Sequence, residues 1–190
     1  MIADCLVPVY MHGPHRIFFE KWLGDKNASS GSSAKLLDIG SGGGLPAIPL
    51  ALAVGLEVTL IERTGKKAEF LRRALKLLGI SGQVLNCDFR EFAANPSLKT
   101  ATGSLALPAG ATPKFNIATI RWVKADHAML RKACSMLDRD DVDHGLVYYS
   151  ATPDCNITPD DPLERYVYSY RLAGDTRPSR TLTVFQHKDT

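Results

Sequence analysis

Short apolar runs alternate with amphipathic stretches along most of the chain. Five runs predict buried strands, at residues 36–39, 56–61, 83–86, 115–120 and 145–149. Two later segments alternate between apolar and polar residues and predict a closing antiparallel hairpin, at 166–172 and 181–187. Helical periodicity predicts helices between the runs, at 47–54, 66–78 and 125–137. Strands that alternate with helices indicate an α/β fold, mostly parallel, with helices on both faces of the sheet.

The helix predicted at 66–78 has two distinct faces. Its apolar face consists of Phe70, Leu71, Ala74, Leu75 and Leu78, and its polar face of Lys66, Lys67, Glu69, Arg72, Arg73 and Lys76. Five positive side chains on one helix can contact RNA phosphates, and they are also typical of a solvated helix face. The pattern leaves both interpretations open.

The pattern predicts less regular structure elsewhere. A helix is expected at 15–23 and a Gly/Ser/Asn-rich linker at 24–33, so that residues 1–33 precede a main domain at 34–190. A long surface loop is expected at 95–113. The helix at 125–137 is expected to bury one face, made of Ala128, Met129, Ala133, Met136 and Leu137.

The composition is that of a globular protein. The 190 residues are 45% hydrophobic and 23% charged, which suffices for one domain with a sizeable core. No apolar run is long enough to span a membrane, and the N-terminus shows no secretory signal. The four cysteines are widely spaced, which predicts free thiols in a reducing compartment rather than a zinc site. The net charge of +3 permits a nucleic-acid partner without requiring one.

A glycine-rich segment follows the first predicted strand. Gly40, Gly42 and Gly44 occupy alternate positions, and Pro46 can begin the next helix because its missing N–H costs nothing there. Glycine lets a ligand approach the backbone closely, and the helix start presents free N–H groups. This order predicts a site for a nucleotide-like cofactor, with an ordinary turn as the alternative. Counted from Gly40, the dinucleotide fingerprint fails, because Leu45 stands where its third glycine or alanine is needed.

An acidic residue, Glu62, stands at the end of the second predicted strand. A carboxylate about 20 residues past such a loop can accept hydrogen bonds from the hydroxyls of a ribose. Alone it is also typical of a solvated charge at a strand end. After a glycine loop, it favours a nucleoside ligand.

The acidic residue two places before the first glycine makes the loop resemble motif I of the class I S-adenosylmethionine-dependent methyltransferases. The resemblance implies a Rossmann-like sheet and S-adenosylmethionine as the cofactor. It places Asp38 near the methionine end of the cofactor. It also implies cofactor-binding residues along the loop, which are Gly40, Ser41, Gly42, Gly44 and Leu45.

Two further segments are assigned by their place in such a sheet. Class I methyltransferases hold the adenine in the loop after the third strand, which here contains Asp88, Phe89 and Arg90. We expect Asp88 to contact the adenine, to cap the helix that begins near Phe89, or to do both. Arg121 ends the fourth strand, and ligands of open α/β sheets bind at that end of the strands. We therefore expect Arg121 to position the cofactor carboxylate or the substrate without transferring a proton, a surface arginine being the alternative.

Three segments taken together resemble one family within this class. They are residues 37–51 with the glycine loop, 62–71 with Glu62, Arg63 and a lysine-rich turn, and 115–121 with the strand that ends in Arg121. The family is ribosomal RNA small subunit methyltransferase G, also called glucose-inhibited division protein B. The resemblance implies methylation at N7 of a guanine in 16S rRNA, and it assigns Arg63 to the cofactor site beside Glu62.

The implied reaction suits a site without an evident general base. Guanine N7 carries a lone pair and no proton, so the protein's tasks are alignment and electrostatic stabilisation. The expected partner is 16S rRNA or the small ribosomal subunit, with no DNA, membrane or metal, and the expected compartment is the cytoplasm. Two alternatives stay open: a methyltransferase for a small molecule or a protein side chain, and a non-catalytic cofactor-binding or interaction module.

Overall fold

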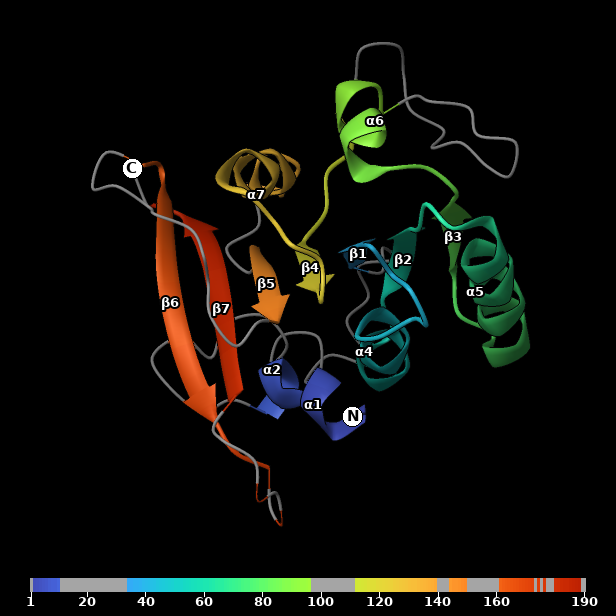
Figure 1. Cartoon of the computed structure of the whole chain (residues 1–190), viewed down its shortest axis with the longest axis horizontal. Coiled ribbons are helices and arrows are strands. Elements are labelled where there is room, and N and C mark those ends of the chain that lie inside the picture. Colours follow the sequence, from blue (N-terminus) through green and yellow to red (C-terminus); the bar gives the residue numbers. More distant parts are fainter. Residues whose placement is uncertain are drawn as a thin grey trace, which may run out of the picture.

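The computed structural model describes residues 2–10, 34–96, 112–139, 144–149, 161–172, 174, 176 and 180–188. Its strands form one seven-stranded sheet in the order β3-β2-β1-β4-β5-β7-β6 (Figure 1). The strands are β1 (Lys35–Ile39), β2 (Glu57–Ile61), β3 (Gly82–Leu85), β4 (Ile117–Arg121), β5 (Gly145–Tyr149), β6 (Leu163–Tyr170) and β7 (Arg180–His187). Strands β1 to β5 run parallel, and β7 is antiparallel to both β5 and β6. The predicted mostly parallel sheet with a closing hairpin is confirmed.

The central strands are buried on both faces, as their apolar runs predict. Every residue of β4 and β5 is buried, whereas every second residue along most of β6 is exposed. The hairpin begins at Leu163, earlier than the predicted residue 166, because Leu163 already pairs with His187 of β7. Strand β4 begins later than predicted, because Phe115 makes only an isolated bridge to Leu137.

Helices cover both faces of the sheet: α4 and α5 lie on the same face as the N-terminal helices, and α6 and α7 lie on the other (Figure 1). The helices are α1 (Ile2–Cys5), α2 (Val7–Tyr10), α4 (Ala47–Val54), α5 (Gly65–Leu78), α6 (Phe89–Ala94) and α7 (His127–Cys134). The core accordingly has two clusters of buried side chains, one beneath each helical layer. The predicted helices at 47–54 and 66–78 are confirmed, and each ends at a left-handed glycine, Gly55 or Gly79.

The predicted apolar face of α5 is partly wrong. Leu71 and Leu75 are buried together with Ala68, whereas Phe70 is 55% exposed and Leu78 is 45% exposed. Phe70 is adjacent to Leu71 in sequence and lies about 100° away from it around the helix, on the solvent side. The buried stripe is therefore narrower than the apolar pattern predicts.

The predicted extent of α7 also needs correction. Asp126 caps the helix by accepting a hydrogen bond from the backbone N–H of Met129 at 2.8 Å, so the helix begins after residue 126. It buries Leu130 and Cys134 in addition to the predicted Met129 and Ala133, and Ala128 is exposed. The chain leaves the helix at Cys134, and residues 136 and 137 are buried beyond its end.

The described part of the N-terminal segment forms α1 and α2, which no sequence pattern predicts. The helix expected at 15–23, the linker at 24–33 and most of the loop at 95–113 lie outside the described residues. The division into a segment 1–33 and a domain 34–190 stays a prediction. Among the described helices, none combines the length and apolar character that crossing a membrane requires.

Candidate functional site

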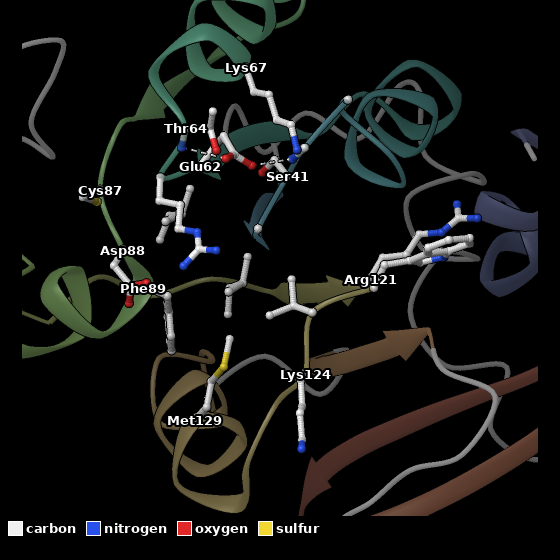
Figure 2. A pocket seen from close by; sticks show the side chains of 18 of the residues that line it. Ser41, Glu62, Thr64, Lys67, Cys87, Asp88, Phe89, Arg121, Lys124 and Met129 are labelled. Carbon is white, nitrogen blue, oxygen red and sulfur yellow. Dashed lines mark hydrogen bonds between the residues drawn. The ribbon is translucent and has the colours of Figure 1, made fainter.

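A cavity of about 720 Å³ opens at the carboxyl ends of β1, β2 and β4 (Figure 2). This volume lies in the range of small-molecule sites. Ten predicted site residues line the cavity: Gly40, Ser41, Gly42, Leu45, Glu62, Arg63, Asp88, Phe89, Arg90 and Arg121. Two predicted residues, Asp38 and Gly44, do not line it. The fold therefore brings four separate segments of the sequence to one cavity.

The three alternate glycines of the loop are needed for different structural reasons. All three have positive φ, at 73° for Gly40, 54° for Gly42 and 85° for Gly44. A Cβ on Gly44 would overlap the side chain of Ile48, and one on Gly40 would overlap Val123, so these two glycines permit close packing within the protein. Among the described residues, a Cβ on Gly42 would meet only the carbonyl oxygen of Gly40, at 3.8 Å. Gly42 is thus the glycine that leaves backbone open to a ligand.

The Glu62 carboxylate holds the glycine loop to the start of α5 (Figure 2). Its Oε2 accepts a hydrogen bond from the Gly42 N–H at 2.9 Å, and its Oε1 accepts one from the Thr64 N–H at 2.7 Å. Glu62 is 5% exposed and lines the cavity. A carboxylate has about four acceptor positions, so roughly two remain for a ligand. Glu62 can therefore fix the loop and accept hydrogen bonds from hydroxyl groups at the same time.

Asp38 lies beneath the cavity rather than in its wall. Its Oδ1 accepts a hydrogen bond from the Thr119 hydroxyl at 2.6 Å, and its Oδ2 has no hydrogen-bond partner among the described residues. Asp38 is 1% exposed. Burial raises the pKa of Asp38 from 3.8 to about 6, although the hydrogen bond from Thr119 and the charge of Arg121 oppose the rise. Its expected contact with the methionine end of a cofactor stays a prediction.

The segment after β3 supplies a second wall of the cavity. Asp88 caps α6: its Oδ1 accepts a hydrogen bond from the Arg90 N–H at 2.8 Å, and the Glu91 side chain accepts one from the Asp88 N–H at 3.3 Å. The capping alternative for Asp88 is therefore confirmed, and its contact with an adenine stays a prediction. Phe89 is 5% exposed and adds an apolar surface to the wall. The Arg90 guanidinium pairs with Asp126 at 2.7 Å on the protein surface.

Arg121 borders the cavity, but its guanidinium is turned toward α1 (Figure 2). Nη2 donates to Asp4 Oδ2 at 2.9 Å, and Nη1 donates to Cys5 Sγ at 2.8 Å. The exposed fraction is 6% for the Arg121 side chain and 9% for that of Asp4. Burial acts to raise the pKa of Asp4, but hydrogen bonds from Tyr170 and Arg180 and the charges of Arg180 and Arg121 lower it overall. The guanidinium is thus held in a buried ion pair, and its expected contact with cofactor or substrate stays a prediction.

Several lining residues were not predicted as site residues. They are Thr64 and Lys67 at the start of α5, Cys87 before α6, Trp122, Val123 and Lys124 after β4, and Met129 on α7, with Ile39, Gly43 and Ile61 from the strand ends. Lys67 and Lys124 lie on opposite sides of the cavity (Figure 2). The only sequence signal for Trp122 and Lys124 is their place one and three residues after Arg121. In the described ranges, no cluster of His, Cys, Asp and Glu could hold a metal ion.

The model of one protein family, described as rRNA small subunit methyltransferase G, matches residues 25–105. This range contains the glycine loop, Glu62 and the segment Asp88–Arg90. The family resemblance is confirmed over this segment. Strand β4 with Arg121 and the closing hairpin lie outside the match.

Relatives named ribosomal RNA small subunit methyltransferase G match a short part of the chain. One from Rubrobacter xylanophilus is 54% identical over 52 residues, which are 27% of this chain and 20% of the relative. One from Xylella fastidiosa is 56% identical over 48 residues, 25% of this chain and 23% of the relative. One from Chloroflexus aggregans is 57% identical over 49 residues, 25% of this chain and 21% of the relative. The chain thus matches less than a quarter of the length of each of these relatives.

Solved structures resemble the fold over most of the chain. The precorrin-6y C5,15-methyltransferase from Geobacter metallireducens has a TM-score of 0.59 at 12% identity, over 98% of this chain and 87% of that one. An rRNA methylase from Streptococcus thermophilus has a TM-score of 0.54 at 13% identity, over 83% of this chain and 88% of that one. A complex of MtNAS with S-adenosylmethionine has a TM-score of 0.52 at 17% identity, over 82% and 56%. The fold is that of the class I methyltransferases.

Proposed function

We propose that the cavity binds S-adenosylmethionine and that the chain transfers a methyl group to RNA, specifically to N7 of a guanine in 16S rRNA. One observation carries the proposal: an open glycine loop is hydrogen-bonded to the Glu62 carboxylate at one cavity, within the segment that matches the rRNA methyltransferase family. The cofactor would supply a methyl group activated by its bond to a positively charged sulfur. Because the proposed substrate is ribosomal RNA, we propose that the protein acts in the cytoplasm.

The residues at the cavity fit a nucleoside with a charged tail. Glu62 keeps acceptor positions for the two ribose hydroxyls, and the Gly42 backbone leaves room for close approach. Phe89 and Met129 line the cavity and offer apolar contact to the faces of a purine. We propose that Asp88 and its neighbour Arg90 contact the polar edge of that purine, while Asp88 continues to cap α6.

The acidic groups of the cavity are poorly suited to remove a proton. Both oxygens of Glu62 accept backbone hydrogen bonds, and Asp88 Oδ1 is engaged in the cap of α6. Burial raises the pKa of the Cys87 thiol, which therefore stays protonated at neutral pH. A target atom that carries a lone pair and no proton avoids this difficulty. Guanine N7 is such an atom, which supports it over an exocyclic amine.

The charges at the cavity favour an RNA substrate. Five basic residues line it, Arg63, Lys67, Arg90, Arg121 and Lys124. Arg121 is paired with the buried Asp4 and Arg90 with Asp126. Cations placed around a substrate site attract the phosphates on either side of a target nucleotide. On the outer face of α5, by contrast, Glu69 pairs with two arginines, which supports the interpretation of that face as solvated surface.

Two measurements test the proposal. Calorimetry with S-adenosylhomocysteine tests the cofactor site, and absence of binding would leave only a non-catalytic interaction module. Binding of a 16S rRNA fragment at low and moderate salt tests the substrate class, because phosphate contacts make the affinity fall steeply as salt rises. RNA binding at neither salt, together with intact cofactor binding, would favour a small-molecule or protein substrate. Mass spectrometry of rRNA from cells with and without the gene would then identify the modified nucleotide.

A further inference from the structure

A large aromatic side chain stands exposed at the edge of the cavity. Trp122 is 85% exposed and lines the cavity. Its φ is 57°, and among the described residues it is the only one other than glycine with positive φ. A bulky residue in this region of φ is uncommon and marks a conformation that the surrounding structure imposes.

The residues on either side of Trp122 are anchored in the protein. The Arg121 guanidinium is fixed by Asp4 at 2.9 Å. The Val123 side chain fills the space that a Cβ on Gly40 would need, and the Val123 carbonyl accepts a hydrogen bond from the Tyr148 hydroxyl at 3.3 Å. The turn between two anchored neighbours therefore holds the indole outward. The guanidinium carbon of Arg121 lies 5.8 Å from the indole centroid and supports the ring from the protein side.

The surroundings of Trp122 indicate which ligand would cover it. The same cavity is lined by the basic side chains of Arg63, Lys67 and Lys124. An exposed aromatic ring among cations is the combination that binds single-stranded nucleic acid, because bases stack on the ring while phosphates pair with the cations. A protein partner would gain less from a cavity lined by several cations with a single exposed aromatic side chain at its edge.

We propose that Trp122 is the platform on which the target base stacks during methyl transfer. The inference rests on the proposed RNA methyltransferase function and specifies how the site holds its substrate. In the proposed transfer, the lone pair of the ring nitrogen bonds to the methyl carbon, the carbon–sulfur bond breaks, and its electron pair goes to sulfur. The positive charge thereby moves from the sulfur to the purine. The negative face of an indole attracts a cation, so Trp122 favours the purine more as this charge develops.

The first experiment measures stacking directly. The chain has two tryptophans, Trp22 and Trp122, so the full-length Trp22→Phe variant reports on Trp122 alone. This variant, saturated with S-adenosylhomocysteine, is titrated with guanosine 5′-monophosphate and with 7-methylguanosine 5′-monophosphate. Both should quench the indole fluorescence, and the methylated nucleotide should bind roughly 2- to 30-fold more tightly, the range expected for a cation–π contact. Absence of quenching by both nucleotides would overturn the inference.

The second experiment separates stacking from the fold and from cofactor binding. Trp122→Leu should lower kcat/KM for RNA methylation roughly 5- to 150-fold, the range of a lost base stack, with Trp122→Phe in between. Affinity for S-adenosylhomocysteine should not change. Leu77→Ala is the matched control, because Leu77 is 86% exposed on α5 and does not line the cavity. If Trp122→Leu keeps full kcat/KM, the stacking role is refuted while the proposed function stands, and if the wild type binds no S-adenosylhomocysteine, both fail.

Discussion

Asp38 places a carboxyl group beneath the cavity at 1% exposure, and Asp38→Asn removes its charge with almost no change in shape. Burial raises the pKa of Asp38 from 3.8 to about 6. At roughly 1.4 kcal/mol per pKa unit, ionising Asp38 lowers the free energy of unfolding by about 3 kcal/mol. The asparagine amide would replace Oδ2, which has no partner among the described residues, and that would cost about 1–3 kcal/mol at every pH.

The two contributions have different pH dependences, which separates them. Folding raises the pKa of Asp38, so the protonated carboxyl adds to the free energy of unfolding. This stabilisation is complete below the unfolded pKa of about 4 and is lost as the pH rises through the folded pKa of about 6. The asparagine variant does not titrate at this position, so it does not lose stability in this way as the pH rises. Its free energy of unfolding relative to wild type should therefore increase by about 2–3 kcal/mol between about pH 4 and pH 7. We expect it to be less stable than wild type at about pH 4, and as stable or more stable at about pH 7.

Urea unfolding followed by far-ultraviolet circular dichroism measures this difference, provided that both proteins keep the same m value. Titrations that are common to both proteins cancel in the comparison, including that of Asp4, whose lowered pKa acts in the opposite direction. Glu57→Gln is the matched control, because it makes the same carboxyl-to-amide change at an exposed position of β2. A difference between Asp38→Asn and wild type that is flat, or that decreases with pH, would refute the energetic cost assigned to the charge.

Three further predictions concern the residues around the cavity. Asp4→Asn leaves the Arg121 guanidinium buried opposite a neutral amide, and urea unfolding should show a loss of about 3–5 kcal/mol; a loss under about 1 kcal/mol would contradict a tight ion pair. Gly44→Ala meets both a positive φ and a neighbouring side chain and should cost about 1–3 kcal/mol by thermal unfolding, whereas the control Gly43→Ala, with open space around it, should cost much less. Glu62→Ala should weaken S-adenosylhomocysteine binding by about 1–3 kcal/mol in calorimetry, and an effect on RNA affinity alone would argue against its ribose contact.

The sheet could be predicted from the sequence wherever one local signal dominates. Strands β1, β2, β4 and β5 are buried on both faces and read as continuous apolar runs. Gly55 and Gly79 mark two helix ends because the left-handed conformation favours glycine. The short helices α1 and α2 leave no such signal. Their four residues each are too few to form a helix alone, so contacts such as that between Asp4 and Arg121 hold α1 in place.

The residues of the candidate site also fall into those that a local sequence signal predicts and those that depend on the complete fold. The glycine loop and Glu62 lie in one strand–loop–helix–strand segment, where spacing along the sequence reflects distance in space. Lys67, Lys124 and Met129 reach the cavity from α5, from the connection between β4 and α7, and from α7, so no spacing in the sequence relates them. The orientation of Arg121 depends on Asp4, which lies 117 positions away in the sequence. Such a contact is a property of the complete fold. The strand pattern predicts the backbone position of Arg121 but not the direction of its side chain.

Asp38 beneath the cavity and Trp122 at its edge both lower the stability of the fold. Ionising the buried Asp38 costs about 3 kcal/mol. The left-handed conformation of Trp122 costs about 1–2 kcal/mol, and its exposed ring recovers little of this by burial. Against a typical total of about 5–15 kcal/mol for a whole domain, these costs are large. Glycine at 122 would remove the backbone cost while keeping the sheet, whereas asparagine at 38 would exchange the ionisation cost for that of an amide without a partner among the described residues. A chain that only had to fold would favour glycine at 122, so the strained and exposed Trp122 at the edge of the cavity supports a role in binding that neither packing nor helix capping explains.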